Sequence, residues 1–162
     1  MKSKFLVVLM AVLMIASGLA VVYAEDVSVG SAHFAVPDDF NISSSNDTAV
    51  VLSDNENETI IFDYNIKTAD AAKAYLTAEG YKAGESYNSS VENHELGGKS
   101  SSYSYTIQEF TKGNETAGVY VFNVDNENYV IIAKVSGLDS DDDFDSTDVS
   151  NAVDDIIKAM MG

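Results

Sequence analysis

The sequence of 162 residues predicts an α+β domain in which an antiparallel β-sheet is flanked by two α-helices, preceded by an N-terminal apolar signal helix. Three observations predict this fold class. Much of the chain after residue 24 consists of short segments in which apolar and polar residues alternate, which is the period of a β-strand. Two other segments carry apolar residues at helical spacing. The segment 129–133 is apolar on both faces, so we expect it at the centre of the sheet with a helix over each side.

The first 24 residues have the layout of a secretory signal peptide. Two lysines precede the apolar run 5–16, and Val22-Tyr23-Ala24 supplies the small or medium-sized residues of a cleavage site. We therefore predict cleavage before Glu25 and a single secreted or cell-surface domain over residues 25–162. The alternative is an uncleaved anchor, because the apolar stretch 5–22 reaches the lower limit for a membrane-spanning helix.

Composition and charge exclude several classes of function. The chain has 26 acidic and 9 basic residues, a net charge of −17, and loss of the two lysines in the first 24 residues leaves −19. Too few cations are present for nucleic-acid binding through a basic patch. The absence of cysteine excludes disulfides and thiolate metal sites, and the absence of arginine excludes bidentate clamps. The negative field favours cationic partners or divalent ions.

Strands and turns fill the first part of the domain. Residues 26–29 and 32–36 alternate on either side of Gly30-Ser31 and predict a short hairpin or a bent strand. The run Pro37-Asp38-Asp39-Phe40 predicts the turn that ends it, because proline cannot donate to a ladder and aspartate favours turns. Two more strands are predicted before the first helix, at 49–52 and 59–64.

The first helix is predicted over residues 69–79. Thr68 is a suitable N-cap, and Gly80 is a suitable end. Its apolar residues share one face. They are Ala71, Ala72, Tyr75 and Leu76.

A polar loop is predicted next, followed by strands and a last helix. The strands are predicted at 91–96, 102–110, 117–124 and 129–135. The last helix, residues 147–161, has the strongest helical periodicity in the chain. Asp145 or Ser146 is the expected N-cap, and Asp148 suits the positive end of the helix dipole.

Several of these segments resemble the PsbP-like fold. The run from Phe34 to Phe40 is similar to the strand and "PxxF/W" turn that begin that fold, and the turn Leu96-Gly97-Gly98, the hairpin that leads to 129–132 and the C-terminal amphipathic helix follow the same order. The signal peptide and the Asn/Asp-rich composition resemble small secreted proteins of methanogenic archaea. The resemblance implies an α-β-α sandwich and a binding or assembly role more often than catalysis. It transfers no functional residue, because the fold has no shared catalytic motif.

The loop from Asp139 to Asp148 is the most conspicuous acidic segment. Four carboxylates at alternate positions are of the kind that binds calcium, namely Asp139, Asp141, Asp143 and Asp145. The loop is not an EF-hand, because Phe144 replaces the required glycine and Ser150 the bidentate glutamate. Two interpretations stay open: a non-standard calcium site, or a solvated loop whose acids favour the start of the last helix.

Five sequons of the form N-x-[ST] fit an extracellular location. Their asparagines are Asn41, Asn46, Asn57, Asn88 and Asn114, and we expect them in loops or at strand ends, where a glycan is tolerated. The alternative is that loops rich in Asn, Ser and Thr produce sequons by chance.

No catalytic constellation is recognisable in the sequence. The only histidines are His33 and His94, and no Gly-x-Ser-x-Gly motif accompanies them. Tyr103 and Tyr105 share a strand face and either form a stacking platform or cover the core under a helix. We therefore expect a non-enzymatic extracellular or cell-surface module that binds or assembles with an unknown partner, with membrane contact only through an uncleaved N-terminal segment.

Two alternatives to this function stay open. One is a secreted hydrolase acting on a cell-wall polymer, which a carboxyl group of raised pKa in a cleft would favour. The other is a calcium-dependent surface protein that uses the 139–148 loop.

Overall fold

The computed structural model describes residues 25–161 except 55, 95–99 and 139–141, and it describes no side chain in 92–101. The elements in chain order are β1 (Asp26–Val29), β2 (Ala32–Ala35), β3 (Asn41–Ser45), β4 (Ala49–Ser53), β5 (Glu58–Asp63), α2 (Ala69–Ala78), β6 (Lys82–His94), β7 (Ser100–Lys112), β8 (Glu115–Val124), β9 (Glu127–Ser136), the 3₁₀ turn η1 (Phe144–Ser146) and α3 (Asp148–Met161). Among the residues described, no helix is both long enough and apolar enough to span a membrane.

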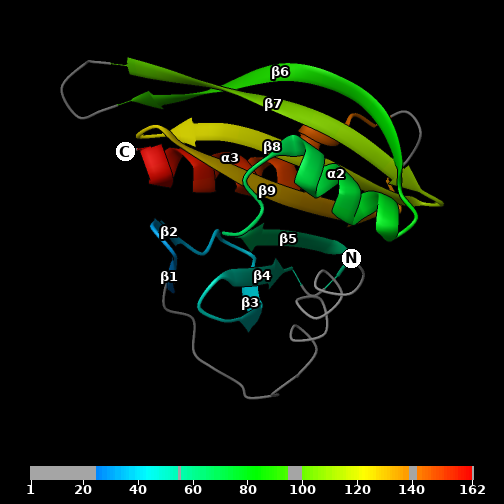
Figure 1. Ribbon diagram of the computed structural model, residues 1–162, viewed down its shortest axis with the longest axis horizontal. Helices are drawn as coiled ribbons and strands as arrows, with labels where there is room; N and C mark the ends of the chain where they lie inside the picture. Colours follow the sequence, from blue (N-terminus) through cyan, green and yellow to red (C-terminus); the bar gives the residue numbers. More distant parts are fainter. Residues whose placement is uncertain (1–24, 55, 95–99, 139–141, 162) are drawn as a thin grey trace, which may run out of the picture.

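Seven antiparallel strands form the main sheet, in the order β3-β4-β5-β9-β8-β7-β6 (Figure 1). The predicted α+β class is confirmed, and β9 lies at the centre as its apolar sequence predicted. Val130 and Ile132 belong to the apolar cluster on one face of β9, and Ile131 and Ala133 to the cluster on the other. All four residues are at most 2% exposed, so both faces of the central strand are covered.

The two helices pack on opposite faces of this sheet. Ala72 and Leu76 of α2 are buried in the cluster that contains Ile132. Val153 and Ile157 of α3 are buried in the other cluster, which also contains the β1–β2 hairpin. This hairpin forms a separate two-stranded sheet. The main sheet, both helices and both clusters are formed by described residues of the segment 26–161.

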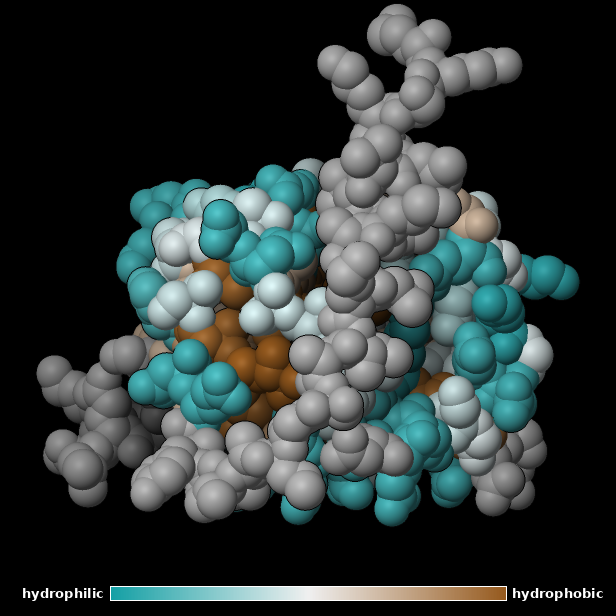
Figure 2. All heavy atoms as spheres, turned by 90° about the horizontal axis from the view of Figure 1, so that it is seen from below, coloured by the Kyte–Doolittle hydropathy of each residue, from teal (hydrophilic) through white to brown (hydrophobic). Residues whose placement is uncertain are grey.

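Hydrophilic side chains cover much of the face seen in Figure 2, with apolar groups showing between them. The apolar cluster that contains Val153 and Ile157 of α3 is called the α3-side cluster below. Some of the apolar residues that pack against it remain partly exposed. They are Val36, Ile42, Tyr64, Tyr87, Tyr103, Val124, Leu138, Met160 and Met161. The apolar core therefore reaches the surface in places, as expected for a chain of this length.

The cap of α2 was predicted correctly, and the cap of α3 was not. The Thr68 hydroxyl accepts a hydrogen bond from the backbone N–H of Ala71 at 3.2 Å. At α3 the cap is Thr147, whose hydroxyl accepts from the N–H of Ser150 at 3.2 Å. Asp145 and Ser146, the expected caps, lie two residues and one residue before Thr147, in the 3₁₀ turn η1 that buries Phe144.

Two strands lie where the sequence predicted turns and loops. β3 was missed, and β6 begins at Lys82 rather than at Val91. Both are the outermost strands of the sheet and need few apolar residues, because each contacts the core along only part of one face. In β6 the residues in contact with the α3-side cluster are Tyr87 and Val91. The polar sequences of β3 and β6 resemble loops, although their backbones pair with β4 and β7 along most of their length.

Candidate functional site

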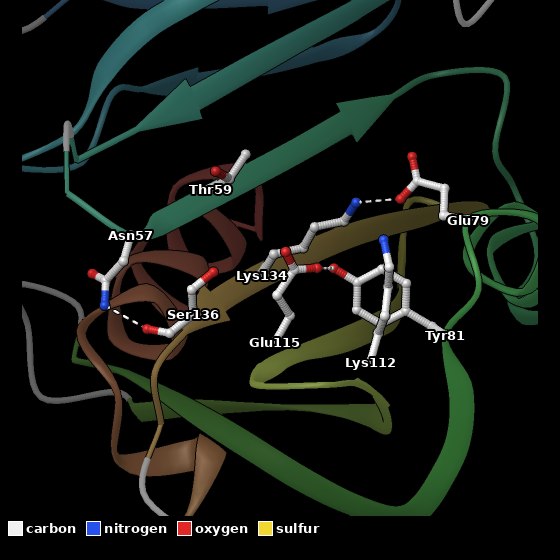
Figure 3. A pocket seen from close by; sticks show the side chains of 8 residues that line it. All are labelled: Asn57, Thr59, Glu79, Tyr81, Lys112, Glu115, Lys134 and Ser136. Carbon is white, nitrogen blue, oxygen red and sulfur yellow. Dashed lines mark hydrogen bonds and ion pairs between the residues drawn. The ribbon is translucent and has the colours of Figure 1, made fainter.

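A polar pocket of about 420 Å³ opens at the end of the sheet where β9 finishes and β5 and β8 begin (Figure 3). Its lining residues come from four separate parts of the chain. They are Asn57, Thr59, Glu79, Tyr81, Lys112, Glu115, Lys134 and Ser136. Of these residues, the sequence had indicated only Asn57 as a candidate site residue, as the asparagine of a sequon.

The backbone explains how these residues meet. Lys134 and Ser136 alternate with buried residues of β9, and Thr59 of β5 stands opposite Lys134 in the ladder. Glu79 is the C-cap of α2. Gly80 follows at φ +95°, a left-handed conformation that ends the helix and turns the chain so that Tyr81 reaches the pocket wall.

Opposite charges and a phenol interact inside the pocket. The Lys134 Nζ atom lies 2.6 Å from a Glu79 carboxylate oxygen. The Tyr81 hydroxyl donates to Glu115 Oε2 at 2.6 Å. The ammonium groups of Lys112 and Lys134 lie 5.4 and 5.2 Å from the centre of the Tyr81 ring. Burial, reinforced by Glu115, raises the pKa of Tyr81 well above its ordinary value, so the phenol remains a proton donor at neutral pH.

This arrangement suits a small ligand that both donates and accepts hydrogen bonds. Two lysines and two glutamates balance in charge within a chain whose net charge is −17. The ammonium groups of Lys112 and Lys134 offer donors, and carboxylate, hydroxyl and carbonyl oxygens offer acceptors. The Tyr81 ring is only 4% exposed, so it supports the pocket wall rather than offering a stacking surface.

A second, more acidic groove of about 360 Å³ lies at the same end of the sheet and shares Asn57 and Ser136 with the pocket. The side-chain amide of Asn57 donates a hydrogen bond to the Ser136 carbonyl at 2.6 Å. This bond connects the start of β5 to the end of β9, between the pocket and the groove. Glu58 lines the groove and is 9% exposed. Burial raises the pKa of Glu58, Asp54 and Asp148 raise it further, and a hydrogen bond from the Val149 backbone lowers it.

The acidic loop is described only in part. Asp139 and Asp141 lie outside the described residues. Asp143 and Asp145 are exposed, and the Asp145 carboxylate accepts from the Ser150 hydroxyl at 3.3 Å. Within the part of the chain that the structure describes, no three His, Asp or Glu residues are grouped to hold a metal ion. Calcium binding by the full loop therefore stays a prediction.

The five sequon asparagines are all exposed, but they do not all lie in loops or at strand ends. Asn46, Asn57 and Asn114 lie between strands, and Asn41 is the first residue of β3. Asn88 lies in the middle of β6, contrary to the expectation, because the predicted polar loop is part of that strand. Glycan occupancy of each of the five asparagines stays a prediction.

The paired tyrosines of β7 cover the core under α3. Tyr105 is 3% exposed, and its hydroxyl donates to Asp154 at 2.5 Å. The Tyr103 hydroxyl donates to the Met161 carbonyl at 3.1 Å. His33 pairs with the Ser28 hydroxyl at 2.8 Å on the exposed face of the β1–β2 hairpin, and the His94 side chain lies outside the described residues.

A hydrogen-bonded cluster around Glu127 was also missed in the sequence. The Glu127 carboxylate accepts from Lys67 Nζ at 2.8 Å and from the hydroxyls of Tyr64, Ser31 and Tyr129 at 2.6, 2.7 and 2.9 Å. These donors, Lys67 foremost, hold the pKa of Glu127 well below its usual range. The Glu127 cluster joins the β1–β2 hairpin and the segment before α2 to the β8–β9 turn.

Comparison with known proteins finds no match to a family model, a curated protein or a solved structure. The resemblance to the PsbP-like fold therefore rests on the sequence features that suggested it.

Proposed function

We propose that this chain is a non-enzymatic binding module that works outside the cell or at its surface, and that its polar pocket holds a small uncharged or zwitterionic group of the partner. The observation that carries the proposal is the balance of charge in the pocket: Lys112 and Lys134 offset Glu79 and Glu115 while the rest of the chain is strongly acidic. A free anion is repelled by the whole molecule, whereas a neutral polar group is not.

The signal-like N-terminal segment supports the extracellular location. The antiparallel sheet with a helix on each face supports assignment to the PsbP-like α-β-α class, which favours binding or assembly over catalysis. One fold class hosts many unrelated functions, so the pocket carries the proposal.

The test is a titration of residues 25–162 followed by NMR chemical shifts. N-acetylglucosamine, glycine and acetate serve as hydroxyl-rich, zwitterionic and anionic probes. We expect glycine or N-acetylglucosamine to shift the signals of Lys134, Ser136 and Tyr81, and acetate to shift them less. The variant Lys112→Ala removes a donor and should weaken that binding about ten-fold.

Lys73→Ala is the matched control, because Lys73 is exposed on α2 and is not part of the pocket lining. It removes the same charge and should leave the affinity within about two-fold. If none of the probes shifts the pocket signals, or if both lysine variants weaken binding equally, the pocket is not the binding site.

A secreted hydrolase acting on a cell-wall polymer is the second candidate, favoured by one observation. Glu58 is a buried carboxyl group of raised pKa in the acidic groove, which suits a general acid. Incubation of residues 25–162 with cell-wall polymer, followed by assay of released reducing ends and amines, tests this candidate. Release that Glu58→Gln abolishes would support the hydrolase, and no release above the buffer control would count against it.

A further inference from the structure

The outer edge of β6 is long and open. Among the described residues, β6 is the last strand on its side of the sheet, and no strand pairs with its outer edge (Figure 1). An edge strand leaves alternate backbone N–H and C=O groups without ladder partners, so it is a template for another strand. β6 has 13 residues, more than twice the usual strand length of about 5–6.

The two edges of the sheet differ in protection. At the opposite edge, β3 has only 5 residues, and its register with β4 shifts between Ile42 and Ser44. In β6 the register with β7 shifts only between Ala83 and Ser86, and pairing is regular from Ser86 to His94. That stretch contains neither lysine nor proline, two residues that commonly protect sheet edges.

We propose that β6 pairs with β6 of a second copy of this chain, antiparallel and edge to edge, so that two seven-stranded sheets join into one. The distribution of charge favours a second copy. Residues 86–91 carry no charge, although the chain as a whole is strongly acidic. Two copies can therefore approach here with less repulsion than a random pair of surfaces would meet.

The sequence of β6 is also compatible with pairing to itself. A two-fold axis perpendicular to the sheet can pass through Tyr87, Asn88 or Ser89. In each of these registers, Glu85 and Glu92 stand opposite an uncharged residue or a lysine, so no carboxylate opposes a carboxylate across the new ladder. The association is isologous and closes at two copies, because pairing uses up the β6 edge of each.

Salt and glycosylation should both act on this contact. The remaining acidic residues of the two copies repel each other over a distance that salt shortens, so added salt should strengthen the dimer. Asn88 is an exposed sequon residue at the middle of the edge. A glycan on it would block pairing by its bulk.

The experiment is sedimentation equilibrium of unglycosylated residues 25–162 from about 10 µM to about 1 mM, at about 0.15 and 0.5 M sodium chloride. We expect a monomer–dimer equilibrium that shifts toward the dimer at the higher salt concentration. Amide hydrogen exchange in β6 should slow as the protein concentration rises, and exchange in β3 should not change.

Two variants test the edge itself. Asn88 and Thr106 are directly paired, are both exposed, and share one hydrogen bond of 3.1 Å. Asn88→Lys and Thr106→Lys therefore remove the same hydrogen bond and add the same charge, one on the edge strand and one on its neighbour. We expect Asn88→Lys to weaken dimerisation at least about ten-fold, and Thr106→Lys less than about three-fold.

Three results would overturn the proposal. They are a monomer throughout the concentration range, equal effects of the two lysine variants, and a dimer whose β6 amides exchange as fast as those of the monomer. The last result does not depend on either variant folding, because it is measured on the unsubstituted chain.

Discussion

Single residues fix the position of the β1–β2 hairpin. Gly30 has φ +61°, and a Cβ atom there would lie 2.5 Å from the ring of Tyr64. The neighbouring Ser31 hydroxyl donates to Glu127, which also accepts from Tyr64 and from Lys67. The Lys67 ammonium lies 3.4 Å from the centre of the Tyr64 ring, so a cation, two rings and a carboxylate meet where three segments join.

The Glu127→Gln substitution tests this cluster at the scale of one charge. The pKa of Glu127 is depressed in the fold, so its stabilising effect is complete above the ordinary glutamate pKa of 4.5 and is lost as the pH falls toward the lower folded value. We expect the variant to unfold a few degrees below the parent at pH 7, and the difference to shrink as the pH falls below 4.5. Thermal unfolding followed by circular dichroism from pH 3 to 7 measures this.

Asp125→Asn is the control for that experiment. It removes a charge from the same β8–β9 turn without removing a partner of the Glu127 cluster, and its φ of +51° is one that asparagine tolerates. A Glu127→Gln variant as stable as Asp125→Asn at pH 7 would mean that the cluster does not anchor the hairpin.

At the scale of elements, the sequence predicted those helices and strands whose apolar residues recur with a clear period. α3 and β9 were found because their apolar residues face a core on one side or on both. β3 and most of β6 were missed because edge strands of Ser, Asn and Glu satisfy the ladder without an apolar face. The residue composition of a strand does not show which strand it pairs with. β3 and β6 could therefore be recognised only from their pairing with β4 and β7.

The pocket was missed for a related reason. Its residues are separated by up to 79 positions, as in the hydrogen bond between Asn57 and Ser136. One local signal was present: Lys134 is the single charged residue within the apolar segment 129–135. A lysine in a central strand needs a partner, and the partner is Glu79 at the end of α2. The partner itself depends on topology, which the sequence pattern does not specify.

At the scale of the whole molecule, uncompensated negative charge opposes compactness. The described ion pairs engage only Lys67, Lys134 and Lys158, against 26 acidic residues in the chain. Repulsion between the remaining carboxylates is spread over the surface and should weaken as salt screens it. This effect depends on ionic strength and not on the identity of the cation.

Thermal unfolding of residues 25–162 separates that general effect from a calcium site in the acidic loop. We expect the unfolding midpoint to rise with sodium chloride and to rise equally with calcium or magnesium chloride of the same ionic strength, each measured against a sample in EDTA. A bound ion would instead stabilise the fold by a saturable amount at low concentration. A calcium-specific rise that saturates at low concentration would contradict the solvated-loop interpretation and place an ion near Asp143 and Asp145. A loss of that rise in Asp143→Asn, but not in Asp125→Asn, would locate the ion at the loop, because both changes remove one exposed carboxylate.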